Sequence, residues 1–301
     1  MRGVGKSILK WFAGMVIFVA LLGGAYFKLE EFSAQKVHEF ADRYSDFVHL
    51  EFDRALINPI DRSLSVWGLR CDFAIGSSCT AERVMVEKFD HEHNIPRFLK
   101  GSIKGVNVPV DFMNFGSFAS EFRKMGYDEL NFDLLAEYIY EDETKRLSVR
   151  KLNFDGTETC RVSAAFDLGD MKLHNPGISG LIGVSMLDGG LVWQDRSLTE
   201  RLLNLSAETD QKDSQSYRAE LLEGLQLETQ KARSLGNGYA ENFYAEMKKF
   251  IENPGELVIR VDPAEPVPLL YMFMGRNFEE LLELYGVTVE AGNPRINTEN
   301  N

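Results

Sequence analysis

Two cysteines sit close together in a stretch that could do chemistry. Cys71 and Cys79 bracket a Gly-Ser-Ser turn in "LRCDFAIGSSCT" at residues 69–80. This spacing suits a disulfide, half of a metal site or a pair of reactive thiols, and the redox compartment decides between these chemistries. The third cysteine, Cys160, falls on a predicted strand, where we expect a small buried residue. A bridge from Cys160 to either of the other two is the alternative.

Other residue types that support catalysis or metal binding do not form complete sites. The stretch "DHEHN" at residues 90–94 places two imidazoles beside two carboxylates, but no third ligand follows at a known spacing, so we interpret it as a solvated loop. The surroundings of Ser179 and Ser185 do not match a nucleophile elbow. "GVGKS" at residues 3–7 lacks the first glycine and the leading strand of a phosphate-binding loop. We therefore predict no metal, no cofactor and no catalytic residue, with a hydrolase as the third-ranked reading.

The N-terminal residues set the compartment. Residues 11–27, "WFAGMVIFVALLGGAYF", run for 17 residues without a charge, which approaches the length of about 20 residues that a membrane helix needs. Arg2, Lys6 and Lys10 precede this run, and acidic residues follow Lys28, so the positive-inside bias places the start of the chain in the cytoplasm. We predict a cytoplasmic start and transmembrane anchor at residues 1–28. A cleaved signal peptide is the alternative, because residues 23–25 are small.

Charge constrains the partners of the rest of the chain. The formal net charge is −13, and the four basic residues of 1–28 are among the 33 of the whole chain, so 29 basic residues face 46 acidic ones after Lys28. A surface with this balance of −17 argues against nucleic acid and against anionic lipid head groups as partners reached by bulk attraction. It does not argue against apolar ligands inside the fold.

The pattern of apolar residues predicts the elements that position these side chains. An amphipathic helix is expected at residues 30–46, followed by a hairpin with its turn at 58–61 and by strands from residues 80 and 97. A short helix at 117–126 precedes a second hairpin, 128–156, and a strand at 158–168. Residues 181–194 read as a further hairpin that turns at Asp188-Gly189. Three helices are expected in 197–252, with short helices and closing strands in 255–291.

Helices that are grouped, rather than alternating with strands, favour an α+β fold on a mostly antiparallel, curved sheet. We predict one extracytoplasmic domain at 29–292, with a strand-rich part at 46–195 and a helical insertion near 197–252, and a disordered tail at 293–301. Phenylalanines gather around the first short helix. They fill the core or line an apolar surface for lipid, and the candidate surface is Phe112, Phe115, Phe118, Phe122 and Phe132.

The order of these segments resembles a known family. A short basic start and one apolar segment are followed by "HLEFDRALINPIDRSLSVWGLRCDF" at 49–73, "AERVMVEKF" at 81–89 and "IKGVNVPVDF" at 103–112. This arrangement is similar to the opening of AsmA-like proteins. The resemblance implies a periplasmic protein anchored in the bacterial inner membrane and linked to envelope lipid handling. The chain departs from the family where it turns to helices instead of continuing in repeated strands.

Together these observations predict a single-pass envelope protein that acts by binding lipid or another apolar ligand in the periplasm. The alternative is an adaptor that binds another envelope protein through the phenylalanine-rich face or the helices of 197–252. Outside the cytoplasm, the cysteine spacing favours a disulfide between Cys71 and Cys79. Its ring of about nine residues is worth roughly 2.5 kcal/mol in the chain-entropy model.

Overall fold

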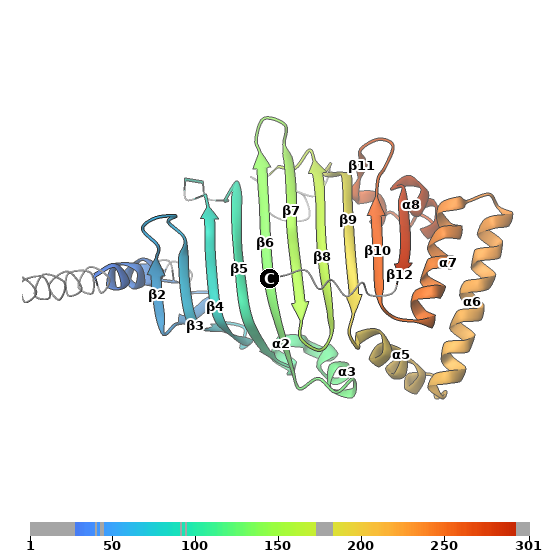
Figure 1. Ribbon diagram of the computed structural model, residues 1–301, viewed down its shortest axis with the longest axis horizontal. Helices are drawn as coiled ribbons and strands as arrows, with labels where there is room; N and C mark the ends of the chain where they lie inside the picture. The colour runs from blue at the N-terminus through green and yellow to red at the C-terminus, as the bar shows by residue number, and fades with distance from the viewer. Residues whose placement is uncertain are drawn as a thin grey trace, which may run out of the picture.

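The computed structural model describes residues 28–39, 41–42, 45–90, 92–93, 95–172 and 183–292. They form an α+β fold on one large antiparallel sheet (Figure 1). The strand order is β1-β3-β4-β5-β6-β7-β8-β9-β10-β12, while β2 also pairs with β3 and β11 with β9. The strands are β1 (Val48–Glu51), β2 (Arg54–Ile57), β3 (Leu64–Phe73), β4 (Ser78–Phe89), β5 (Phe98–Pro109), β6 (Glu129–Glu141), β7 (Arg146–Gly156), β8 (Cys160–Gly169), β9 (Ser185–Asp195), β10 (Glu256–Val261), β11 (Val267–Pro268) and β12 (Val287–Gly292).

Helices begin where short polar side chains cap them. The Asp213 carboxylate accepts hydrogen bonds from the first turn of the longest helix, and the Asn237 side chain does the same for the next helix. Residues 28–39 are also helical. The remaining helices are α2 (Phe112–Phe115), η1 (Gly116–Phe118), α3 (Ala119–Lys124), α5 (Leu198–Thr209), α6 (Ser214–Ser234), α7 (Gly238–Glu252), η2 (Leu269–Phe273) and α8 (Phe278–Leu284).

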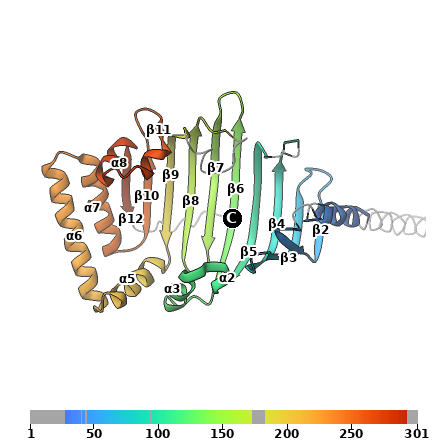
Figure 2. The same cartoon turned by 180° about the vertical axis from the view of Figure 1, so that it is seen from behind.

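The described helices gather at the ends of the sheet and along one edge. Figures 1 and 2, seen from opposite sides, place the helix of 28–39 beside β2 and the helices α6, α7 and α8 near β12. The short helices α2 and α3 lie at the strand ends, at the lower edge in Figure 1. Neither view shows a described helix across the central strands. Among the described residues, the middle of the sheet is therefore a single layer.

The hydrophobic core is correspondingly divided. At the β12 end, Leu203, Phe250, Ile251, Leu257 and Val289 form one cluster between helices and sheet. At the other end, Val37 of the N-terminal helix packs against Ala55 and Val66. A further cluster joins the short helices to the lower edge and consists of Val110, Ala119, Met125 and Tyr127.

Helices also close both edges of the sheet. The Asn242 side chain of α7 donates to the Val289 carbonyl at 3.1 Å and accepts from the Val289 N–H at 2.8 Å. Glu246 accepts from the N–H of Ala291 at 2.9 Å. At the opposite edge, the Ser33 hydroxyl accepts from the Ile57 N–H at 2.9 Å. An open strand edge can pair with another chain, and these bonds occupy part of that pairing capacity at β12 and at β2.

Two glycines stand where a strand has a backbone conformation that other residues rarely adopt. Gly68 and Gly105 have φ values of 64° and 59°, and a Cβ at either position would collide with the carboxylate side chain of Asp53 or Glu82. The pairing of β5 with β6 shifts between Ile103 and Val106. Such a bulge turns the chain by one residue, so apolar side chains return to the same face beyond it.

The structure confirms most predicted elements and corrects one. The hairpin expected at 128–156 is β6 and β7, and the three helices expected in 197–252 are α5, α6 and α7. The hairpin predicted at 181–194 is wrong, because β9 runs straight through Asp188 and Gly189. Gly189 is not a turn residue. A Cβ at that position would lie 3.0 Å from the Cβ of Phe166, so glycine leaves room for the Phe166 side chain. The short helix predicted at 117–126 is η1 and α3, and a separate short helix, α2, precedes it where Asp111 caps the chain.

In the described part of the chain, no helix has the length and apolar character to cross a bilayer. The membrane segment predicted at 11–27 and the tail at 293–301 lie outside the described residues.

Candidate functional site: an open apolar face of the sheet

One face of the sheet carries unbroken rows of apolar residues that run across the strands. Residues directly opposite in antiparallel strands point to the same face, so the printed register defines each row. The first row is Ala55, Val66, Val84, Ile103, Leu134, Phe154, Val162, Trp193, Leu257 and Ala291. The second row is Ile57, Leu64, Val86, Gly101, Ala136, Leu152, Ala164, Leu191, Ile259 and Val289.

A third row continues the pattern from β4 to β12. It is Phe89, Leu99, Tyr138, Val149, Phe166, Gly189, Val261 and Val287. Its single polar group is satisfied, because the Tyr138 hydroxyl donates to the Pro96 carbonyl at 3.0 Å. Burial raises the pKa of Tyr138, so the hydroxyl stays neutral. The three rows therefore present no charge.

The opposite face is polar. Lys100, Glu137 and Lys151 stand opposite one another on β5, β6 and β7. Arg161 pairs with Asp155 at 2.6 Å on the same side of β8 and β7. Such half-exposed ion pairs add little stability. Charged side chains favour contact with water, so this face is the solvated one.

Helices cover the two ends of the apolar rows and leave the middle open. Val37 covers the rows at β2 and β3, and the α5–α7 cluster covers Trp193 and Leu257. Between them, from β5 to β9, the side chains are half-buried although strands flank them on both sides, and Leu152 is 43% exposed. We call this part the open strip, and it consists of Gly101, Ile103, Leu134, Ala136, Leu152, Phe154, Val162, Ala164 and Leu191.

The open strip leads into an apolar hollow. The hollow has a volume of about 380 Å³ and is lined by side chains of β7 to β10, such as Phe154, Ala164 and Ile259. Ligand pockets have volumes of roughly 300–1,000 Å³. Small residues create this space, because Ala164 and Gly189 stand where larger side chains would fill it. The arrangement can hold a hydrocarbon but offers no group for acid–base or nucleophilic chemistry.

The structure divides the phenylalanines that were predicted to form one surface. Phe115 and Phe122 contact each other with ring centroids 5.0 Å apart and pack in the lower-edge core. Phe112 and Phe118, from the same helical segment, are 73% and 68% exposed. Phe132 lies on β6, where its ring is 5.0 Å from that of Phe154. Only Phe132 therefore belongs to the apolar face.

The two cysteines lie opposite each other near the β3–β4 turn. Cys71 and Cys79 are partners in the strand register and are 4.1 Å apart as free thiols, so the disulfide stays a prediction. Burial, followed by the nearby Cys79, raises the pKa of the Cys71 thiol to about 12. Cys160 is buried at the start of β8, as predicted for a small core residue.

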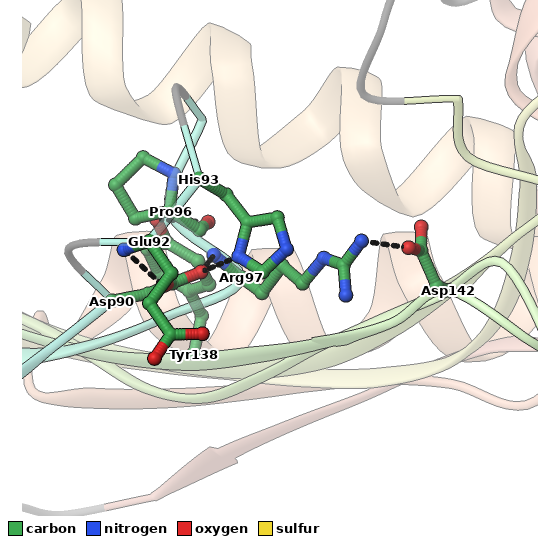
Figure 3. Close-up of polar contacts among 7 residues, drawn as sticks. All are labelled: Asp90, Glu92, His93, Pro96, Arg97, Tyr138 and Asp142. Atoms are coloured by element: carbon green, nitrogen blue, oxygen red, sulfur yellow. Dashed lines mark hydrogen bonds and ion pairs between the residues drawn. The ribbon is translucent and has the colours of Figure 1, made fainter.

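The histidine-containing loop is a structural clamp around Asp90. Its carboxylate is 5% exposed and accepts hydrogen bonds from the N–H groups of Glu92 and Arg97 and from His93 Nδ1, at 2.8–2.9 Å (Figure 3). The Arg97 N–H is the largest influence, and together these donors lower the pKa of Asp90 to about 2. The loop was predicted to be solvated, which is wrong for Asp90. Within the described residues, no group of three or more His, Cys, Asp or Glu side chains is placed to hold a metal.

A larger hollow of about 1120 Å³ lies along the glycine breaks. Its lining is mostly polar, and the carboxylate of Asp133 is used within the fold, where it accepts from the Gly105 N–H at 2.7 Å. Asn107 and Asn131 likewise bond to each other at 2.9 Å. Asp133, Asn107 and Asn131 are therefore engaged in hydrogen bonds within the sheet.

Comparison with known proteins finds a match, and it covers the part of the chain that holds the apolar hollow. A family model described as "Uncharacterized protein" matches residues 152–292. This range begins in β7 and ends with β12, and every residue that lines the hollow lies within it. No curated protein matches the chain.

Proposed function

We propose that the protein is a single-pass, membrane-anchored envelope protein that binds the acyl chains of a lipid on its open strip and acts by binding rather than by catalysis. The proposal places the anchor in the bacterial inner membrane and the sheet in the periplasm, as the AsmA-like pattern implies. The observation that carries it is the set of apolar rows whose middle no described element covers.

Length and polarity favour a hydrocarbon occupant. At about 4.8 Å per strand, the open strip from β5 to β9 extends roughly 20 Å. An acyl chain of one leaflet spans about half of a hydrocarbon core of about 30 Å. The strip is therefore long enough for such a chain. A protein partner would need hydrogen-bonding groups, roughly one bond per 100–200 Å² of interface. The rows expose none to a partner, because the Tyr138 hydroxyl is bonded to Pro96 and the unpaired indole N–H of Trp193 is buried.

The position of the strip also suits a short carrier. The rows run from the helix of 28–39, which follows the predicted anchor, toward the helices at the β12 end. Side chains such as Asn242 and Ser33 bond to the outer strands β12 and β2. The sheet thus holds a ligand near one membrane.

Two native tryptophans provide a test. Trp193 lies in the first apolar row beside Val162, whereas Trp67 lies on the other face under the guanidinium groups of Arg54 and Arg83. Full chains that retain only one of these tryptophans, with Phe at the other and at residue 11, are reconstituted in vesicles of phospholipid brominated on the acyl chain.

Val162 of the open strip stands next to Trp193, so we expect brominated acyl chains bound there to quench Trp193 emission from one side, although helices cover the indole, and to leave Trp67 emission unchanged. Equal quenching of both, or unchanged Trp193 emission in a folded chain, overturns the proposal. Vesicles of the same phospholipid without bromine serve as the reference for each variant.

A further inference from the structure

A second apolar surface lies outside the open strip, at the lower edge of the sheet. Large side chains protrude there from three separate segments: the turn before β1, the β3–β4 turn and the α2–η1 segment. We call it the tip cluster, and it consists of Phe47 (71% exposed), Phe73 (40%), Ile75 (78%), Phe112 (73%), Met113 (57%) and Phe118 (68%).

Hydrogen bonds hold these segments against one another. The Ala74 N–H donates to the Phe47 carbonyl at 2.9 Å, which joins the turn before β1 to the β3–β4 turn. The Ser78 N–H donates to the Asn114 side chain at 3.0 Å, which joins the β3–β4 turn to α2. Met113 also lies over Gly76, where a Cβ would be 3.4 Å from its sulfur. The exposed side chains are therefore fixed in place as one surface.

The shape of the tip cluster suits a lipid surface. Its side chains stand on turns that project from the ends of strands, so they can enter one surface together. Large exposed apolar patches mark protein or membrane interaction sites. Interfacial segments bury aromatic and aliphatic side chains at the boundary between head groups and acyl chains.

The predicted anchor would hold the tip cluster close to a bilayer. The described residues begin at Lys28, directly after the 17 uncharged residues 11–27, and Phe47 follows only 19 residues later. A surface tethered this closely meets the bilayer at a high effective concentration, so a few apolar side chains suffice. We propose that the tip cluster inserts into the surface of the membrane that anchors the protein. This inference rests on the predicted anchor and does not require lipid on the open strip.

Photocrosslinking of the full chain tests this surface. A photoreactive phenylalanine analogue replaces Ile75 or Phe112, and the chain is reconstituted in vesicles of phosphatidylethanolamine and phosphatidylglycerol. Ile60 is the matched control, because it is 92% exposed and lies in the turn at the opposite end of β3, roughly 33 Å away at 3.3 Å per residue.

We expect phospholipid adducts at positions 75 and 112 to exceed those at position 60 by about tenfold or more. Equal adducts at all three positions, or adducts to protein alone at 75 and 112, overturn the proposal. The same analogue at Phe154, on the open strip, reports lipid binding there independently, so failure at one surface is distinguished from failure at the other.

Discussion

A charge placed on the open strip should weaken lipid binding strongly without unfolding the protein. β8 offers a matched pair of neighbouring alanines for this experiment. Ala164 stands opposite Leu152 and Leu191 and lines the apolar hollow, whereas Ala165 stands opposite Gly190 on the other face. Ala164→Glu and Ala165→Glu therefore add the same group, one residue apart, to opposite faces.

The magnitude follows from the environment of each position. Without lipid, Ala164 is half-buried and open to water, so a glutamate there is solvated and costs about 1 kcal/mol of stability or less. With an acyl chain bound, the carboxylate lies against hydrocarbon, where a charged side chain costs about 2.5–3.5 kcal/mol. At 1.4 kcal/mol per factor of ten, lipid binding falls by roughly 60- to 300-fold. Ala165→Glu remains in water and should bind as the unchanged chain does.

A phospholipid with a photoreactive acyl chain provides the assay. The full chain is irradiated in vesicles that contain this lipid, and mass spectrometry measures the adducts on peptides from β7 to β9. Adducts on the peptide of residues 11–27 serve as the internal standard. We expect the ratio to fall for Ala164→Glu, to fall less for the uncharged Ala164→Gln, and to recover for Ala164→Glu at low pH, because desolvation raises the pKa of a carboxyl and favours its neutral form. Equal ratios for Ala164→Glu and Ala165→Glu would refute the reasoning.

Three further predictions concern the fold. Asn242→Ala leaves both polar groups of a buried edge residue unpaired and should lower the free energy of unfolding by roughly 2–3 kcal/mol, whereas Glu246→Gln keeps an acceptor and should leave it nearly unchanged; chemical denaturation measures both. The pKa of Asp90 lies near 2, below its ordinary 3.8, so the stability it contributes is present above about pH 4 and is lost as the pH falls toward 2; Asp90→Asn should flatten the melting temperature over this interval, and an unaltered profile would contradict the clamp. Non-reducing peptide mapping should find Cys71 linked to Cys79 in protein from the envelope, and two free thiols would remove the bond.

Strands with one apolar face were predictable from the sequence, because alternation of side chains needs only local pattern. The hairpin of β6 and β7 and the helices α5 to α7 lie where pattern and caps predict them. The error at Asp188-Gly189 has a physical cause. That dipeptide favours a turn locally, but pairing with β8 and β10 on both sides keeps the backbone extended.

The candidate site could not be predicted from the sequence, because it depends on the register of every strand pair in the sheet. A shift of one residue in any strand pair would move apolar side chains to the other face. The pairings shift register between Val86 and Lys88, between Glu137 and Tyr138, and between Val149 and Leu152, and only their combined effect keeps the third row on the same face as the other two. The phenylalanines near the first short helix drew attention by number, yet the rows use Phe89, Phe154 and Phe166 instead, and of the predicted five only Phe132 contacts a row, at Phe154.

The most direct test of lipid binding compares two adjacent residues of β7 in native membranes. A photoreactive phenylalanine analogue replaces Phe154, on the open strip, or Asn153, on the polar face, and the full chain is irradiated in intact cells. We predict phospholipid or acyl-chain adducts at position 154 and none above background at position 153. Adducts to a protein alone at position 154 would support the adaptor instead, and equal lipid adducts at both positions would contradict a lipid-binding face.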